Sequence, residues 1–169
     1  MHMGNIAQIC SRPTDSERFY RMALEVNPAY EEALFELAFL LESEDQLERA
    51  IILFQDYLDT YPYAAVAWHH LGLAYKKLGQ IDKALEAFDF ALVIQDDFTT
   101  AYFQKGVLLL EKQRYQEAIA CFLQVSQYSP KDLHNLYHIA ECFENLSLYR
   151  DAHRYYHKVT ELDPDYVDA

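Results

Sequence analysis

The stretch Trp68-His69-His70-Leu71-Gly72-Leu73-Ala74-Tyr75 decides how this chain folds. Two residues separate Trp68 from a Leu-Gly pair, and two more separate that pair from Tyr75. Ala84 follows nine residues after the tyrosine, and Phe88 follows four residues after the alanine. The same positions recur at intervals of 34 residues, so the stretch is one copy of a repeated unit.

Four independent sets of positions share this period. One set holds prolines, with an aspartate in the gap at position 96, and the others hold alanines, aromatics and small residues. The sets are Pro28, Pro62, Pro130 and Pro164; Ala50, Ala84, Ala118 and Ala152; Phe54, Phe88, Phe122 and Tyr156; and Ala38, Gly72, Gly106 and Ala140.

Each set has a physical reason. Small residues let the two helices of a unit approach, and the aromatic one turn after each alanine would fill the space between consecutive units. Each proline stands after the second helix, which it cannot continue. In the second unit Gly79-Gln80 marks the turn between the helices. The corresponding turns near 43–46, 113–114 and 147 lack glycine, so we expect tighter caps of ordinary residues there.

This pattern resembles the tetratricopeptide repeat (TPR), a helix-turn-helix unit of about 34 residues. The resemblance covers roughly residues 14–166 and implies an all-α fold, a right-handed superhelical solenoid of stacked units. It predicts a fragment of a longer array, with a partial N-terminal repeat over 1–30. Full units are assigned to 31–64, 65–98, 99–132 and 133–166, and the start of a further unit to 167–169.

The last predicted helix, over 150–162, carries a row of apolar residues, Tyr155, Tyr156, Val159 and Leu162. In a stacked array such a face is covered by the next unit. We therefore expect self-association through the C-terminal repeat. A structural module that stacks with copies of itself is the alternative function.

Composition narrows the classes of partner. The net charge is −13, which argues against binding to nucleic acid and to anionic membrane surfaces. The acid is concentrated in residues 1–64, which hold 12 acidic and 4 basic residues. This imbalance serves solubility or a preference for basic and polar-aromatic partners. The three cysteines do not form a disulfide framework, and together with the absence of an apolar run of membrane-spanning length they favour a cytoplasmic protein.

The resemblance implies that the first helices line a concave groove that binds a peptide or a partner protein. Rigid aromatics would serve there as anchors and polar neighbours would set the register. The predicted binding residues are Phe35, Phe39, His69, His70, Leu73, Phe103, Gln104, Tyr137, His138 and Glu141. The alternative for Phe35, Phe39 and Phe103 is packing against adjacent helices alone.

Three other sites are weighed and set aside. The carboxylate clamp of co-chaperone TPR domains needs asparagine and cationic pairs, which neither frame of inner positions carries. These positions hold Phe35, Phe39, His70, Thr100 and Gln104, or His69, Leu73, Gln104, His134 and His138. The imidazoles of His134 and His138 with Glu141, and the pair His153 and His157, have spacings that could hold a metal, but such pairs are weakly specific. We predict no metal, no cofactor and no enzymatic activity, because no phosphate-binding loop or nucleophile motif is found.

Overall fold

The computed structural model describes residues 13–166, and every regular element in that range is an α-helix. The helices are α2 (Pro13–Val26), α3 (Glu31–Ser43), α4 (Leu47–Thr60), α5 (Ala65–Lys77), α6 (Ile81–Ile94), α7 (Thr99–Glu111), α8 (Tyr115–Tyr128), α9 (Leu133–Asn145) and α10 (Tyr149–Leu162). The predicted all-α architecture of helix-turn-helix repeats is confirmed.

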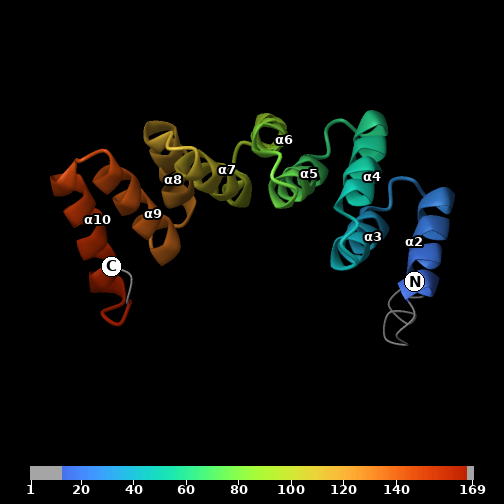
Figure 1. Cartoon of the computed structure of the whole chain (residues 1–169), viewed down its shortest axis with the longest axis horizontal. Helices are drawn as coiled ribbons and strands as arrows, with labels where there is room; N and C mark the ends of the chain where they lie inside the picture. The colour runs from blue at the N-terminus through green and yellow to red at the C-terminus, as the bar shows by residue number, and fades with distance from the viewer. Residues whose placement is uncertain (1–12, 167–169) are drawn as a thin grey trace. The chain divides into compact units, whose positions relative to one another are not determined.

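The chain divides into two compact units, residues 1–94 and 95–169. Among the described residues, unit 1 holds α2 to α6 and unit 2 holds α7 to α10 (Figure 1). The right-handed superhelix concerns the chain as a whole and stays a prediction. The predicted start of a further repeat at 167–169 and the first part of the partial repeat at 1–30 lie outside the described residues.

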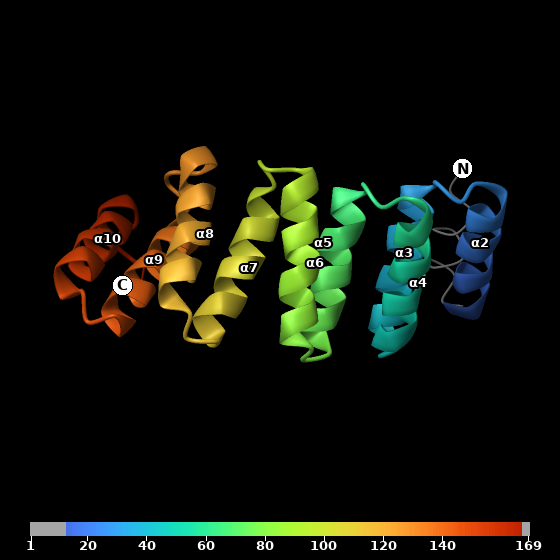
Figure 2. The same cartoon turned by 90° about the horizontal axis from the view of Figure 1, so that it is seen from above.

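Consecutive helices within each unit pack side by side, as α5 and α6 do in unit 1 (Figure 2). The core follows the repeat. Phe54, Phe88 and Phe122 are at most 1% exposed, and the alanines one turn before them are fully buried. Burial of each ring contributes about 1.5–3 kcal/mol relative to exposure. At the fifth position of the alanine set, Ser16 is also fully buried.

Two glycines on the first helices make room for these rings. A Cβ atom added to Gly72 would lie 2.7 Å from the Phe88 ring, and one added to Gly106 would lie 2.6 Å from the Phe122 ring. Both distances are shorter than van der Waals contact. The small residues are therefore required because an aromatic ring of the second helix rests directly on the first helix.

The turns between paired helices share one geometry, and the expected tighter caps are wrong. Asp45, Gly79, Gln113 and Ser147 all have positive φ, between 58° and 73°. In the first turn the amide of Asp45 donates to the Glu42 carbonyl at 3.2 Å, and that of Gln46 to the Leu41 carbonyl at 2.8 Å. The other three turns repeat both bonds. This is the Schellman motif, which satisfies the last carbonyls of a helix through one left-handed residue.

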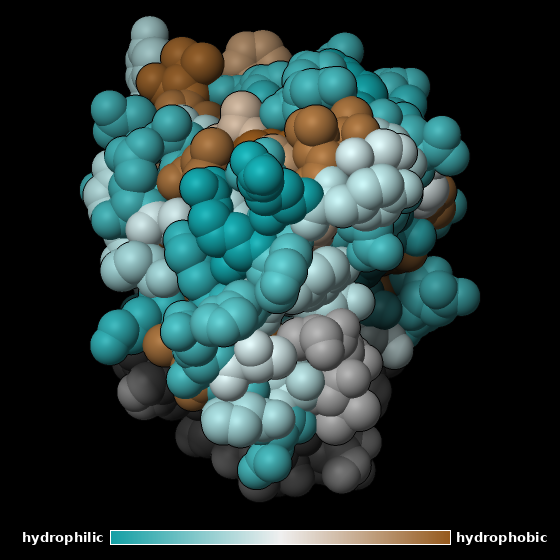
Figure 3. Space-filling model, turned by 90° about the vertical axis from the view of Figure 1, so that its left-hand side faces the viewer, coloured by the Kyte–Doolittle hydropathy of each residue, from teal (hydrophilic) through white to brown (hydrophobic). Residues whose placement is uncertain are grey.

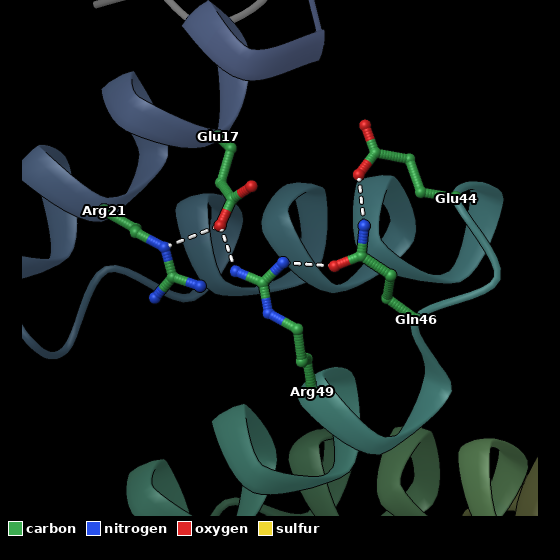
Figure 4. A network of polar contacts seen from close by, with 5 residues as sticks. All are labelled: Glu17, Arg21, Glu44, Gln46 and Arg49. Atoms are coloured by element: carbon green, nitrogen blue, oxygen red, sulfur yellow. Dashed lines mark hydrogen bonds and ion pairs between the residues drawn. The ribbon is translucent and has the colours of Figure 1, made fainter.

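A polar network joins α2 to α4 in unit 1 (Figure 4). Glu17 Oε1 accepts from Arg21 Nε at 2.9 Å and from Arg49 Nη2 at 2.5 Å, and Arg49 also donates to Gln46. Burial alone would raise the pKa of Glu17, but the hydrogen bonds from Arg21 and Arg49 outweigh it and lower that pKa. The carboxylate therefore stays ionised and ties α2 to α4.

The apolar side of α10 is not left uncovered, contrary to the sequence-based expectation. Val159 is fully buried, Tyr155 is 9% exposed, and the Tyr155 ring stacks on Phe143 of α9 at 5.7 Å. Side chains on the outer face of α10 are polar, among them Arg150, His153 and Arg154, and that end of the molecule is mostly hydrophilic (Figure 3). The reason given for self-association is removed, and self-association itself stays a prediction.

The shared turn geometry predicts opposite effects for a reciprocal pair of substitutions. Gln113→Gly should stabilise the protein by about 1 kcal/mol, because a left-handed residue with a Cβ costs roughly 1–2 kcal/mol. Gly79→Gln should destabilise it by a similar amount, although a Cβ there would meet no atom within 4 Å. Urea unfolding of both variants checks this. Destabilisation by Gln113→Gly would contradict it.

Candidate functional site

The predicted binding residues lie on the first helices of the repeats, and we call them the inner strip. In unit 1 the inner strip consists of Phe35 and Phe39 on α3 and of His69, His70 and Leu73 on α5. In unit 2 it consists of Phe103 and Gln104 on α7 and of Tyr137, His138 and Glu141 on α9. Most of these side chains are half-buried, whereas Phe39 is 62% exposed.

One ring in each first helix contacts the buried aromatic of its own repeat. In unit 1 the ring centroids of Phe35 and Phe54 are 6.3 Å apart, and those of His69 and Phe88 are 5.7 Å apart. In unit 2 the distances are 5.8 Å for Phe103 and Phe122 and 5.6 Å for Tyr137 and Tyr156. These four inner positions are spaced by 34 residues, so the contact is a property of the repeat.

The residue that follows in sequence contacts the buried aromatic of the preceding repeat. The imidazole of His70 stacks on Phe54 at 6.0 Å, and that of His138 stacks on Phe122 at 5.4 Å. At the same register the Tyr20 hydroxyl donates to Glu36 at 3.4 Å. Each buried aromatic is thus held between the first helices of two successive repeats.

These contacts bear on the choice between binding and packing. Phe35 contacts both Phe54 and His70, the latter at 4.7 Å, and Phe103 contacts Phe122 and His138. Both rings therefore pack, yet both remain partly exposed. An inner ring backed by a buried ring has little side-chain entropy left to lose when a ligand covers it.

The electrostatics of the unit 1 strip favour neutral imidazoles. Burial, with a further contribution from His70, lowers the pKa of His69 to about 4. Burial also lowers the pKa of His70, with Lys77 acting in the same direction and Glu42 against it. Lys77 and Glu42 form an ion pair between α5 and α3 at the edge of the strip. At neutral pH the two rings therefore present an uncharged surface.

The polar groups of unit 2 hold α9 in place. The fully buried Asn135 donates to the Phe122 carbonyl at 3.0 Å and to the Ser126 hydroxyl at 2.8 Å. Nδ1 of His138 lies 3.1 Å from Glu141 Oε2. The Tyr156 hydroxyl donates to Glu144 at 2.8 Å, and burial followed by this bond raises the pKa of Tyr156.

A hollow of about 450 Å³ opens beside the inner strip in unit 2. Its lining residues come from α7, the end of α8 and the start of α9, and are Thr99, Thr100, Phe103, Gln104, Val125, Ser129, Asp132, His134 and His138. Sequence reasoning did not point to Thr99, Val125, Ser129 or Asp132 as part of a site. The proline-marked loop around Pro130 is the one local signal that places this corner between two repeats.

Other kinds of site are tested on the described residues. No group of three or more histidine, cysteine or acidic side chains within 13–166 could hold a metal ion. Cys121 and Cys142 are buried and free, and burial raises the pKa of the Cys142 thiol to about 12, which makes it a poor nucleophile. Over the same residues, no helix combines the length and apolar character needed to span a membrane.

Sequence models of the tetratricopeptide repeat match residues 11–65, 65–98 and 99–132. The chain belongs to the tetratricopeptide repeat family. The TPR fold indicates a protein-interaction scaffold in the broad sense.

Curated relatives share part of this chain. Human Tetratricopeptide repeat protein 28 is 32% identical over 92 residues, which are 54% of this chain and 4% of the relative. A TPR repeat-containing protein of Methanocaldococcus jannaschii is 34% identical over 87 residues, 52% of this chain and 27% of the relative. Human Superkiller complex protein 3 is 26% identical over 103 residues, 61% and 7% of the two chains. The matches thus span about a quarter or less of each relative.

Solved structures share the fold over nearly the whole chain. A crystal structure of MamA has a TM-score of 0.85 at 19% identity and covers 100% of this chain and 99% of its own. YrrB, described as a TPR protein with an unusual peptide-binding site, has a TM-score of 0.79 at 21% identity and covers 98% and 85%. At these identities the likeness concerns the fold alone.

The lowered pKa of His69 predicts a loss of stability in acid. Between about pH 6.5 and pH 4 the unfolded chain binds a proton that the folded chain does not, so the stability that this group contributes falls as pH falls. The thermal midpoint of the wild type should therefore drop further between pH 7.5 and pH 5 than that of His69→Gln. His153→Gln, which removes an exposed imidazole from α10, is the control and should follow the wild type. Equal drops for all three proteins would contradict the prediction.

Proposed function

We propose that this chain is a non-catalytic scaffold that binds an extended peptide segment of a partner protein along its inner strip. The observation that carries the proposal is the row of half-exposed rings on the first helices, each backed by a buried aromatic. Rings held in this way serve as anchors at low entropic cost. Packing explains their buried edges and leaves their solvent-facing surface available.

The polar neighbours of these rings suit a peptide. Gln104 and Glu141 offer an amide and a carboxylate beside Phe103 and Tyr137, which can set the register of a bound backbone. Phe39 and Leu73 add apolar surface in unit 1, where Phe39 is 62% exposed. YrrB shows that a TPR protein can carry a peptide-binding site, which supports the proposal by analogy of fold.

The same contacts argue against a catalytic role for the hollow. His134 Nδ1 lies 3.1 Å from the Tyr166 hydroxyl, and His138 Nδ1 contacts Glu141. A carboxylate oxygen of Asp132 accepts from the Asn135 amide at 3.1 Å. These groups are engaged in structural contacts rather than arranged as nucleophile, base and orienting acid.

Selection from a displayed library of random peptides against the full chain tests the proposal. Recovered peptides should bind the Phe103→Ala and Tyr137→Ala double variant at least tenfold more weakly than the wild type, because two anchors are lost. Leu123→Ala on α8 is the matched control: it removes an apolar side chain of the same unit that is 40% exposed, and should leave binding unchanged. Circular dichroism at the assay temperature verifies folding. Binding that is insensitive to the double variant would overturn the assignment.

A further inference from the structure

We propose that the hollow in unit 2 receives a cationic side chain of the bound peptide, and that arginine fits it best. This inference rests on the proposed function and adds to it the chemistry of one ligand position. It concerns the corner formed by the start of α7, the end of α8 and the start of α9, all within unit 2.

The lining of the hollow is rich in hydrogen-bond acceptors. Hydroxyls come from Thr99, Thr100 and Ser129, an amide oxygen from Gln104, and a carboxylate from Asp132. None of the nine lining residues is lysine or arginine. A protonated guanidinium or ammonium group can donate to all of these acceptors, whereas a carboxylate or phosphate would face the Asp132 charge without a cation to offset it.

The charge of Asp132 survives its structural task. Its side chain caps α9, whose amino end carries about half a positive elementary charge. A full carboxylate charge exceeds that partial charge, so the corner remains net negative. Asp132 is half-buried, which weakens screening by solvent compared with an exposed carboxylate.

Phe103 supplies a flat surface for a planar cation. Its ring is fixed against Phe122 at 5.8 Å and against His138 at 5.7 Å. A guanidinium can stack on such a ring while its several N–H groups reach the surrounding acceptors, and the apolar Val125 can contact its aliphatic stem. A lysine ammonium offers a point charge without the stacking plane, so we expect it to bind more weakly than arginine.

The charge of the whole chain acts in the same direction. A net charge of −13 attracts cationic segments and repels acidic ones before contact is made. A bound arginine would therefore gain from long-range steering as well as from the hollow.

An NMR titration of the full chain with capped arginine (Nα-acetyl-arginine amide) tests the inference. Capped citrulline has the same shape without the charge and serves as the matched ligand. We expect saturable shifts of the amide signals of Thr100, Phe103 and Gln104 with capped arginine, and at least tenfold weaker binding of capped citrulline. Equal shifts from the two ligands, or no saturable shift at these residues, would overturn the inference.

Two variants separate the local charge from the net charge. Asp132→Asn removes the charge but keeps a good capping residue, so α9 should stay folded while arginine affinity falls about tenfold. Asp151→Asn removes the same charge from the first turn of α10, outside the hollow, and should leave the affinity within twofold. Equal losses in both variants would contradict a site at Asp132.

The outcomes also distinguish this inference from the proposed function. Displayed peptides that depend on Phe103 but bind equally well with citrulline in place of arginine would leave the scaffold proposal standing and refute the arginine site. Arginine-selective shifts at the hollow, without any peptide that depends on Phe103, would refute peptide binding along the strip and support the arginine site alone.

Discussion

Each repeat of this protein depends on one buried aromatic ring in its second helix. Phe54 and Phe122 show the full arrangement, because each ring contacts the first helix of its own repeat and the first helix of the next. A repeat unit cannot bury its apolar face alone, and such a ring is what couples neighbours. The nearby small residues follow from the same constraint, since a Cβ at Gly106 would overlap the Phe122 ring.

This constraint links the fold to the proposed site. The side chains that cover the buried rings from the first helices are those of the inner strip, so one set of contacts both stacks the repeats and fixes the surface offered to a partner. A change in the inner strip is therefore expected to affect stability as well as binding. For that reason variants of Phe103 or His138 need a folding control before a loss of binding is interpreted.

The period of 34 residues was sufficient to predict the helices, the buried Phe54, Phe88 and Phe122, and the small residues opposite them, because these features repeat locally. The turn geometry was not predictable in this way, since Asp45, Gln113 and Ser147 adopt a conformation that sequence reasoning reserves for glycine. The covering of Val159 by α9 and the hollow beside Phe103 also escaped prediction. Both depend on how helices from different parts of the sequence pack in space.

The coupling free energy between a buried ring and the inner-strip ring that stacks on it tests this account most directly. It is obtained from urea unfolding of Phe122→Leu, His138→Ala and the double variant. Ring stacking predicts a coupling of about 0.5–1.5 kcal/mol between the two sites. A parallel cycle of Phe122→Leu with His153→Ala, which lies on the exposed face of α10, should be additive within about 0.5 kcal/mol. Additivity in the Phe122 and His138 cycle would show that the strip is not held by the buried ring and would contradict the account.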